Sequence, residues 1–330
     1  MYGPVDTIAA KVRIPSSNAN FVLCTLLAFV LNLNMIFIRS PTTRKIYSTA
    51  AGTFLLFYSH GSGAFLNLFL VLSTYLSMAV LPRNAGAVMM AACGFSIMMT
   101  VHMYDHMIEA TGWKVGTIVQ VSFAKVLMFA WNYYDAGIMD DKQKSKNMTP
   151  RERYYAEPLK QKPSFFSYMN YLLFIGGAYA GPQIEYRIID DFLNYKGDIT
   201  KMPRYGNLRP AFRRLAECFL CIPVMMFFGS QFKQEYLYDP EYAKQSMPYK
   251  CFYLLGCMHV TIYRLFFAFG SAETNMIVSG ISYTAPKGDK PEEYNTIRNV
   301  GMMGFQFQID GLDAIKNWNI CTANWLKYYV

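Results

Sequence analysis

The stretch FVLCTLLAFVLNLNMIFI, from Phe21 to Ile38, contains no charged side chain. A helix needs about 20 mainly apolar residues to cross the hydrocarbon core of a bilayer. A second run, from Ala64 to Leu81, is also free of charge. A large soluble helical protein could bury such runs, but uncharged stretches of spanning length favour a membrane. We therefore predict that both runs are transmembrane helices.

Further apolar runs follow along the chain. Val115–Trp131 carries Lys125 in its middle, and Ile46–Tyr58 is short, so we expect it to dip or kink at the SHGSG that follows. We expect Cys251–Tyr283 to cross twice, with Gly270 between the crossings. The remaining runs are Ala85–Val101, Phe165–Ala180 and Leu215–Gly229. The predicted fold is all-α, a polytopic transmembrane helical bundle of about eight apolar segments in a single domain over residues 1–330.

The composition agrees with a membrane protein. Hydrophobic residues make up 53% of the chain and charged residues only 16%, against a usual charged share of about 25%. The net charge is +9, and most of the excess lies between the apolar runs, so we expect basic loops on the cytosolic side, near membrane lipids or an anionic soluble substrate. Because no recognisable nucleic-acid-binding module interrupts the runs, we expect no nucleic-acid partner. The first run is typical of a signal-anchor helix, since no small-residue cleavage site follows it.

Three polar connections separate the runs, at approximately residues 135–162, 187–214 and 284–299. The second alternates charged residues with Phe, Leu and Tyr, a pattern that can form helices on the membrane surface. Its basic residues could contact phosphates, although lipid headgroups and membrane topology explain such residues more often. They are Lys201, Arg204, Arg209, Arg213 and Arg214.

The cysteines and histidines do not predict a metal site. The seven cysteines are scattered, and the single Cys218-x-x-Cys221 pair has no second pair beside it, so small buried hydrophobes explain them better. His102 and His106 would share a helix face, but no third ligand is evident. His259, inside an apolar run, is either a core histidine or a catalytic base, and the core role is the default.

Two ionisable residues lie within apolar blocks and need an explanation. Lys125 and Glu273 could pair with other polar groups of the bundle or line an internal cavity. The chain closes on KNWNICTANWLKYYV, Lys316 to Val330, in which an amide, Asn319, adjoins an aromatic stripe. In a helix the stripe would comprise Trp318, Thr322, Trp325 and Tyr329.

An amide in apolar surroundings has two explanations. It could bridge two helices by hydrogen bonds. It could also donate to an oxygen that gains negative charge, as in acyl transfer from a thioester to a hydroxyl within a membrane. That reaction also needs an apolar tunnel for the acyl chain, basic groups for the phosphates of coenzyme A, and a base such as histidine for the hydroxyl.

Several motifs resemble those of the membrane-bound O-acyltransferase family, most closely its lysophospholipid acyltransferases of the lysophosphatidylcholine type. The terminal WNICTANWLKYYV is similar to the family signature W-N-x-x-T-x-x-W-L. FIGGAYAGPQIEYRIIDDFL, Phe174 to Leu193, resembles its Gly-Gly…Gly-Pro-Gln segment, and SAETNMIVSGISY, Ser271 to Tyr283, its span with an internal Glu. The segment from His102 to Gly137 resembles its polar loop leading into a Lys-bearing span.

The resemblance implies roles for particular residues. Asn319 is expected to be the active-site asparagine and Glu273 the intramembrane acid, with further site residues at Gly181, Pro182, Gln183, Thr322, Asn324 and Trp325. Arg209, Arg213 and Arg214 are expected to contact the phosphates of acyl-CoA, which acts as co-substrate without any further cofactor. The implied activity is acylation of the free hydroxyl of a lysophospholipid in the endoplasmic reticulum membrane.

The family's catalytic histidine lies a few dozen residues past the asparagine, beyond Val330, and none of the four histidines here lies in a matching motif. We therefore expect a truncated chain that has little or no acyltransferase activity as it stands. Two other hypotheses stay open. One is a polytopic transporter or channel with an ion path through Lys125 and Glu273, and the other is a catalytically inactive membrane scaffold.

Overall fold

A computed structural model describes residues 11, 16–107, 116–139, 141, 143–178 and 180–330. The α-helices are α2 (Ser16–Leu33), α3 (Pro41–His60), α4 (Ala64–Val80), α5 (Arg83–Met107), α6 (Gly116–Ile138), α7 (Pro150–Ala156), α8 (Phe165–Leu172), α9 (Tyr186–Leu193), α10 (Leu208–Phe219), α11 (Cys221–Gln231), α12 (Pro240–Ala243), α13 (Met247–Ser279), α14 (Met302–Gln306), α15 (Gly311–Ile315) and α16 (Ile320–Tyr329). Short 3-10 helices are η1 (Asn34–Phe37), η2 (Gly61–Gly63), η3 (Lys144–Asn147), η4 (Glu157–Leu159), η5 (Gly197–Lys201) and η6 (Gln234–Tyr238). Within these residues only isolated β-bridges occur, Thr284 with Glu293 and Lys287 with Lys290.

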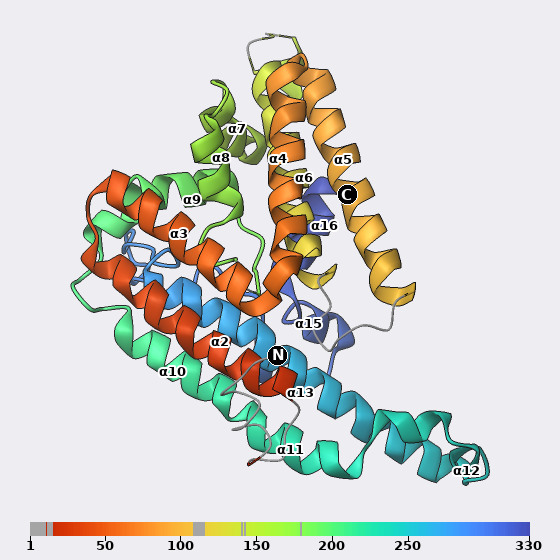
Figure 1. The fold of residues 1–330 in the computed structure, drawn as a ribbon. Coiled ribbons are helices and arrows are strands. Elements are labelled where there is room, and N and C mark those ends of the chain that lie inside the picture. The colour runs from red at the N-terminus through yellow and green to blue at the C-terminus, as the bar shows by residue number, and fades with distance from the viewer. Residues whose placement is uncertain (1–10, 12–15, 108–115, 140, 142, 179) are drawn as a thin grey trace.

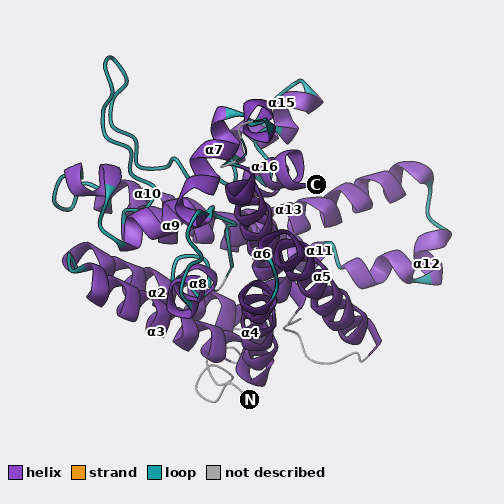
Figure 2. Cartoon of the chain, turned by 90° about the horizontal axis from the view of Figure 1, so that it is seen from above, coloured by secondary structure: helices purple, strands orange, loops and turns teal. Residues whose placement is uncertain are grey.

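The long helices form two groups (Figure 1). α2, α3, α10 and α13 lie side by side in a slanting layer, and α4, α5 and α6 form an upright group beside it. Viewed from above, α4, α5 and α6 gather near the centre, while α11, α12 and part of α13 extend to one side (Figure 2). The last helix, α16, packs against α6.

The long helices expose apolar side chains and bury some polar ones, as expected of a protein in lipid. On α4, Phe65 is 63% exposed and Phe69 is 58% exposed, whereas Asn67 and Thr74 are buried. Inward-facing polar groups of this kind hydrogen-bond within a helix bundle, and the bilayer accepts the exposed aromatic rings. The prediction of an all-α multi-pass membrane protein is confirmed.

The predicted number of apolar segments is not confirmed. Five stretches of the described chain are long and apolar enough to span: Ala19–Phe37, Pro41–Val80, Arg83–Met103, Leu208–Tyr238 and Met247–Ser279. The expected break at Gly270 was wrong, because α13 continues through it; a Cβ at Gly270 would lie 2.5 Å from Cys218 Sγ, so this glycine permits a close approach of α10. The expected kink after Ile46–Tyr58 corresponds to η2, which joins α3 to α4.

The run Phe165–Ala180 does not form a spanning helix. Only Phe165–Leu172 is helical, and the chain then continues irregularly through the protein interior. Non-helical backbone is tolerated at membrane depth when protein groups surround it. Here the Ile175 N–H donates to Ser48 Oγ at 3.3 Å, and a Cβ at Gly52 would lie 2.0 Å from the Leu173 carbonyl oxygen. The segment is therefore pressed directly against α3.

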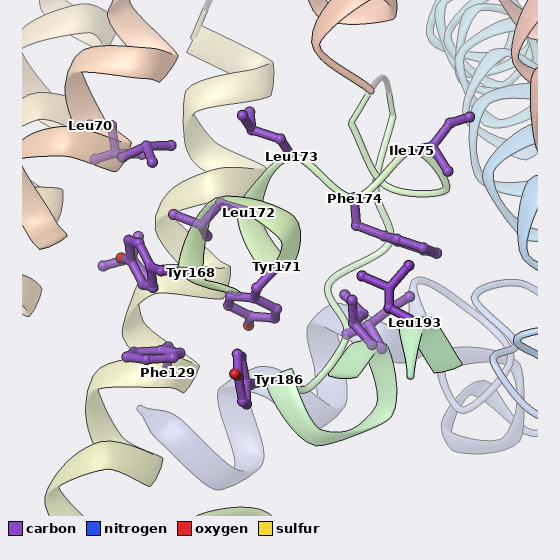
Figure 3. Close-up of a cluster of buried hydrophobic side chains, with 14 of the residues drawn as sticks. Leu70, Phe129, Tyr168, Tyr171, Leu172, Leu173, Phe174, Ile175, Tyr186 and Leu193 are labelled. Atoms are coloured by element: carbon purple, nitrogen blue, oxygen red, sulfur yellow. The ribbon is translucent and has the colours of Figure 1, made fainter. Parts of the chain in front are cut away.

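Aromatic rings fix the position of this segment (Figure 3). Tyr168, Tyr171 and Tyr186 surround Phe129 of α6, with ring centroids 4.9, 5.8 and 5.3 Å from its own. The Tyr171 hydroxyl also donates to the Lys125 carbonyl oxygen at 3.0 Å. Rings in edge-to-face contact stabilise each other beyond the area they bury. The segment that leads to Gly181-Pro182-Gln183 is thus anchored on α6.

Two of the three predicted polar connections contain helices as well as loops. Residues 135–162 include the end of α6, then α7, whose start carries a capping box between Thr149 and Glu152. Residues 187–214 include α9 and the first turns of α10, so Arg209, Arg213 and Arg214 lie on a helix within the span Leu208–Tyr238. Residues 284–299 are irregular apart from the two bridges.

Candidate functional site

Asn319 is the residue from which helix α16 starts. Its backbone has φ 44° and ψ 50°, and its carbonyl oxygen accepts a hydrogen bond from the Ala323 N–H at 3.0 Å. Asn adopts this left-handed conformation more readily than most residues. Asn319 is half-buried and stands at the N-terminus of a helix, where the helix dipole favours negative charge.

The predicted stripe of residues on one face was partly wrong, because Trp318 precedes α16. Its ring packs instead against Phe266, Phe269 and Phe305, at centroid distances of 5.6, 5.7 and 4.7 Å. The left-handed backbone at Asn319 interrupts the helical spacing. Trp318 thus points to α13 and α14, whereas Trp325 packs on α6.

The chain on both sides of Asn319 is tied to residues 299–301. The carbonyl oxygen of Asn299 accepts from the Ile320 N–H at 2.8 Å, and its Oδ1 accepts from the Cys321 N–H at 3.1 Å. The Gly301 N–H donates to the Asn317 carbonyl oxygen at 2.8 Å. The first N–H groups of a helix lack partners within it, and Asn299 supplies two. Residues 299–301 therefore set the position of the backbone on both sides of Asn319.

Residues 299–301 are in turn held by a fully buried acid, Glu273 of α13. Its Oε1 accepts from the backbone N–H groups of Asn299 and Val300, the latter at 2.6 Å. Its Oε2 lies 2.7 Å from Nε of Arg214 on α10. The Arg214 Nη2 donates to the Val300 carbonyl oxygen at 3.0 Å, and Nη1 to Glu217 Oε2 at 2.8 Å. We call Arg214, Glu273, Asn299 and Val300 the Glu273 anchor.

The structure thus brings three predicted site residues together, with Glu273 and Arg214 acting on the Asn319 segment through Asn299. Arg214 Nη1 and Nη2 donate to protein acceptors and its Nε is ion-paired with Glu273, which favours an anchoring role over the predicted contact with coenzyme A. Arg209 and Arg213 are exposed on α10, and Arg213 pairs with Glu217 at 3.2 Å. Their predicted phosphate contacts stay predictions.

The middle of α16 contacts α6 and the Gly181-Pro182-Gln183 segment. The Trp325 indole N–H donates to the Ala124 carbonyl oxygen at 3.2 Å, and Gln183 Nε2 donates to Thr322 Oγ1 at 3.4 Å. Gly181 and Pro182 are buried, and Gly181 has φ 82°. Asn324 is exposed on α16. Gln183 and Thr322, both predicted site residues, therefore lie in contact.

The far end of α16 is fixed by a second buried acid, Glu185. Its Oε1 accepts from the Tyr329 hydroxyl at 2.6 Å and lies 2.7 Å from Arg151 Nη2, and its Oε2 accepts from Asn132 Nδ2 at 2.9 Å. The Trp131 indole N–H donates to the Tyr329 carbonyl oxygen at 3.1 Å. Burial raises the pKa of Glu185, and the bonds from Tyr329, Arg151 and Asn132 oppose that rise. We call Asn132, Arg151, Glu185 and Tyr329 the Glu185 anchor.

Sequence reasoning missed the residues that hold α16 at both ends. Asn299 and Glu185 carry no motif of their own, although Glu185 follows the recognised Gly-Pro-Gln after one apolar residue. An acidic residue so close to that motif, between apolar neighbours, is a sequence signal that could have identified Glu185. The signal for Asn299 is weaker, because its role depends on Glu273 from a distant helix.

None of the histidines whose side chains the structure describes belongs to the segments that contact Asn319 and α16. His259 is exposed on α13, where its Nδ1 lies 2.8 Å from the Leu255 carbonyl oxygen, so the default of a core histidine was wrong. His60, at the end of α3, lies 2.6 Å from Ser59 Oγ through Nδ1. His102 is exposed on α5, and the His106 side chain lies outside the described residues. Among the described side chains, no group of three His, Cys, Asp or Glu is arranged to hold a metal ion.

Comparison with known proteins places the chain. It is 24% identical to Lysophospholipid acyltransferase 2 of Arabidopsis thaliana, over 99% of this chain and 70% of that protein. It is 23% identical to the Lysophospholipid acyltransferase of Schizosaccharomyces pombe, over 88% of this chain and 57% of that protein. It is 24% identical to Membrane-bound glycerophospholipid O-acyltransferase 2 of Rattus norvegicus, over 98% of this chain and 65% of that protein.

A family model agrees with these relatives and covers nearly the whole chain. The match to it runs over residues 25–330, from within α2 to the last residue. With this match, the chain belongs to the membrane-bound O-acyltransferase family.

Proposed function

We propose that this protein is a lysophospholipid O-acyltransferase that uses acyl-CoA as its donor and acts in the endoplasmic reticulum membrane. The names of its relatives and the family match support this proposal. The structural observation that supports it best is the placement of Asn319. This amide stands at the N-terminus of α16, and the Glu273 anchor holds the chain on both sides of it.

The proposed reaction joins a lysophospholipid hydroxyl to the thioester carbonyl carbon. The C–O bond forms, the C–S bond breaks, the hydroxyl proton leaves to a base, and coenzyme A departs as the thiol. Negative charge collects on the carbonyl oxygen as the hydroxyl attacks. An amide N–H and the positive end of a helix dipole would both stabilise that charge. Because both are fixed before the reaction, little reorganisation is needed.

The contacts of Glu273 count against the transporter hypothesis. An ion path through Glu273 needs a carboxylate free to bind and release a cation. Its carboxylate is instead ion-paired with Arg214 and accepts two backbone N–H groups. The contacts therefore assign Glu273 to holding the chain in place.

The test is acyl transfer in membranes of cells that express the natural coding region. Membranes are incubated with acyl-CoA and lysophosphatidylcholine, and the diacyl product is measured by mass spectrometry. We expect product above the vector control, and we expect Asn319→Gly to lower the rate by about 10²–10³-fold, the usual cost of one lost donor to an oxyanion. Glycine is chosen because it keeps the left-handed backbone and removes only the amide.

Ala323→Gly is the matched control, since Ala323 is exposed on the same helix and is not among the predicted site residues. It shows what glycine alone does to α16. Product equal to the vector control in cells that express the natural coding region would refute the proposed activity. An unchanged rate in Asn319→Gly would refute the role of the amide.

A further inference from the structure

A cavity of about 360 Å³ lies between the α2–α3 connection and the segment that leads into α10. This volume is within the range of small-molecule sites, about 300–1,000 Å³. None of its lining residues belongs to the Glu273 anchor, the Glu185 anchor or α16. The α2–α3 connection lies at the end of the slanting helix layer, away from α16 (Figure 1). We call this cavity the arginine cavity.

Three arginines line this cavity, and no acidic residue does. They are Arg39 from the α2–α3 connection, Arg44 from the first turn of α3 and Arg204 from the segment before α10. The rest of the lining is apolar or aromatic and includes Tyr195 and Tyr205. Arginines gathered without a carboxylate repel one another, so the arrangement favours an anionic ligand.

Arg44 is the innermost of the three, because only 1% of it is exposed. Its Nε donates to the Phe192 carbonyl oxygen at 3.1 Å, and Nη1 donates to the carbonyl oxygens of Met35 at 3.0 Å and Ile38 at 2.6 Å. Its Nη2 is buried and has no hydrogen-bond partner among the described residues. Buried polar groups are almost always hydrogen-bonded. An acceptor oxygen of a ligand in this cavity would satisfy the unpartnered nitrogen.

The opening of the cavity shows a second unusual feature. Arg39 and Arg204 are exposed, and the Arg204 guanidinium lies 5.0 Å from the centre of the Tyr205 ring. Tyr195 and Tyr205, which both line the cavity, have left-handed backbones with φ of 53° and 66°. This conformation is rare for bulky residues, and such strain clusters at ligand-binding sites.

We propose that the arginine cavity binds a phosphate group, with Arg44 inside and Arg39 and Arg204 at the mouth. Arginine suits this ligand because its planar fork matches the oxygens of phosphate. The group is carried either by an anionic lipid headgroup or by a soluble phosphate compound. The apolar part of the lining, which includes Met35 and Met202, favours a lipid carrier. This proposal does not depend on the acyltransferase activity, because it concerns a separate set of residues.

The test compares the binding of three probes to the purified protein in neutral detergent at fixed salt. Dihexanoyl phosphatidic acid carries a phosphate monoester on a short lipid, inorganic pyrophosphate is soluble, and dihexanoyl phosphatidylcholine is the zwitterionic control. The readout is the rise in the thermal unfolding midpoint with probe concentration, which gives an apparent Kd. We expect phosphatidic acid to bind and phosphatidylcholine to bind at least tenfold more weakly.

Arg39→Gln and Arg204→Gln test the assignment to this cavity. Both side chains are exposed, so both variants are expected to fold, and each is expected to raise the Kd about tenfold by the loss of a charge-assisted hydrogen bond. Arg264→Gln is the matched control, because Arg264 is exposed on α13 and does not line the cavity.

Each outcome of this test has a defined meaning. Tighter binding of phosphatidic acid than of pyrophosphate identifies a lipid headgroup, and the reverse identifies a soluble phosphate compound. Binding of neither phosphate probe would overturn the proposal. So would unchanged Kd values in both cavity variants, because the phosphate would then bind elsewhere.

Discussion

Replacing Glu273 by glutamine should destabilise the protein and, through residues 299 and 300, also displace Asn319. The carboxylate is fully buried and lies 2.7 Å from the Arg214 guanidinium, and it accepts the N–H groups of Asn299 and Val300. Glutamine retains one oxygen for the two backbone donors. Its amide nitrogen would face Arg214 with donors only, and the opposite charge would be lost.

The size of the loss in unfolding free energy depends on the partners that Arg214 retains in Glu273→Gln. Breaking a buried ion pair by removing one partner costs about 3–5 kcal/mol, because the other charge stays buried. Arg214 keeps its bonds to Glu217, whose side chain is 37% exposed, and to the Val300 carbonyl oxygen. The loss should therefore lie at the lower end of that range, at about 3 kcal/mol.

A double-mutant cycle in mixed micelles measures this loss. Unfolding by increasing SDS fraction, followed by tryptophan fluorescence, is compared for the unmodified protein, Glu273→Gln, Arg214→Gln and the double variant. We expect the double variant to be more stable than the sum of the single losses by about 1–3 kcal/mol, since the two residues interact directly. Glu241→Gln is the matched control, because its pair with Lys244 is exposed and should contribute at most about 1 kcal/mol. Additive losses, or a neutral Glu273→Gln, would refute the anchor.

Three further outcomes are expected. Tyr329→Phe should cost about 1–3 kcal/mol, because Glu185 loses a buried donor at 2.6 Å, while Tyr328→Phe, on an exposed neighbour, should change little in the same SDS titration. Gly52→Ala should sharply lower the folded yield by size-exclusion chromatography, because its Cβ would lie 2.0 Å from the Leu173 carbonyl oxygen; Gly311→Ala, with nothing within 4 Å, should not. Burial raises the pKa of Glu185 above its ordinary 4.5, so the folded state holds that proton more tightly and stability should fall as pH rises from 4.5 through the raised value. Glu185→Gln should flatten this slope in unfolding curves measured between pH 4 and 8, and an equal slope would contradict the assignment.

The sequence predicted the helices that depend only on composition. Ala64–Leu81 corresponds closely to α4, and Phe21–Ile38 covers most of α2 together with η1, because an uncharged run of spanning length has few alternatives. Prediction from the sequence was wrong where tertiary contacts override the local pattern of apolar residues and glycines. Gly270 is a predicted break, yet it lies within α13 and permits contact with Cys218. Phe165–Ala180 is a predicted apolar segment of the bundle, yet its second half is irregular and buried against α3.

For the candidate site, the sequence predicted the motif residues, including Asn319 and Glu273. It did not predict the contacts that hold them in position. The terminal motif and the internal Glu273 were recognised from residue patterns. The pairing of Glu273 with Arg214, and the bonds from Asn299 to α16, join segments that are distant in the chain. Such contacts leave no periodic signal in a single sequence. The arginine cavity is a similar case, because Arg44 and Arg204 meet only in the folded protein.

The most direct test is a structure of the protein in a nanodisc with lysophospholipid and a ketone analogue of acyl-CoA, in which a methylene group separates sulfur from the carbonyl carbon. We predict that the ketone oxygen lies about 2.7–3.1 Å from the Asn319 amide nitrogen, with residues 299–301 still bound to Glu273. A ketone oxygen bound far from Asn319, or an Asn319 amide that faces the lipid, would contradict it.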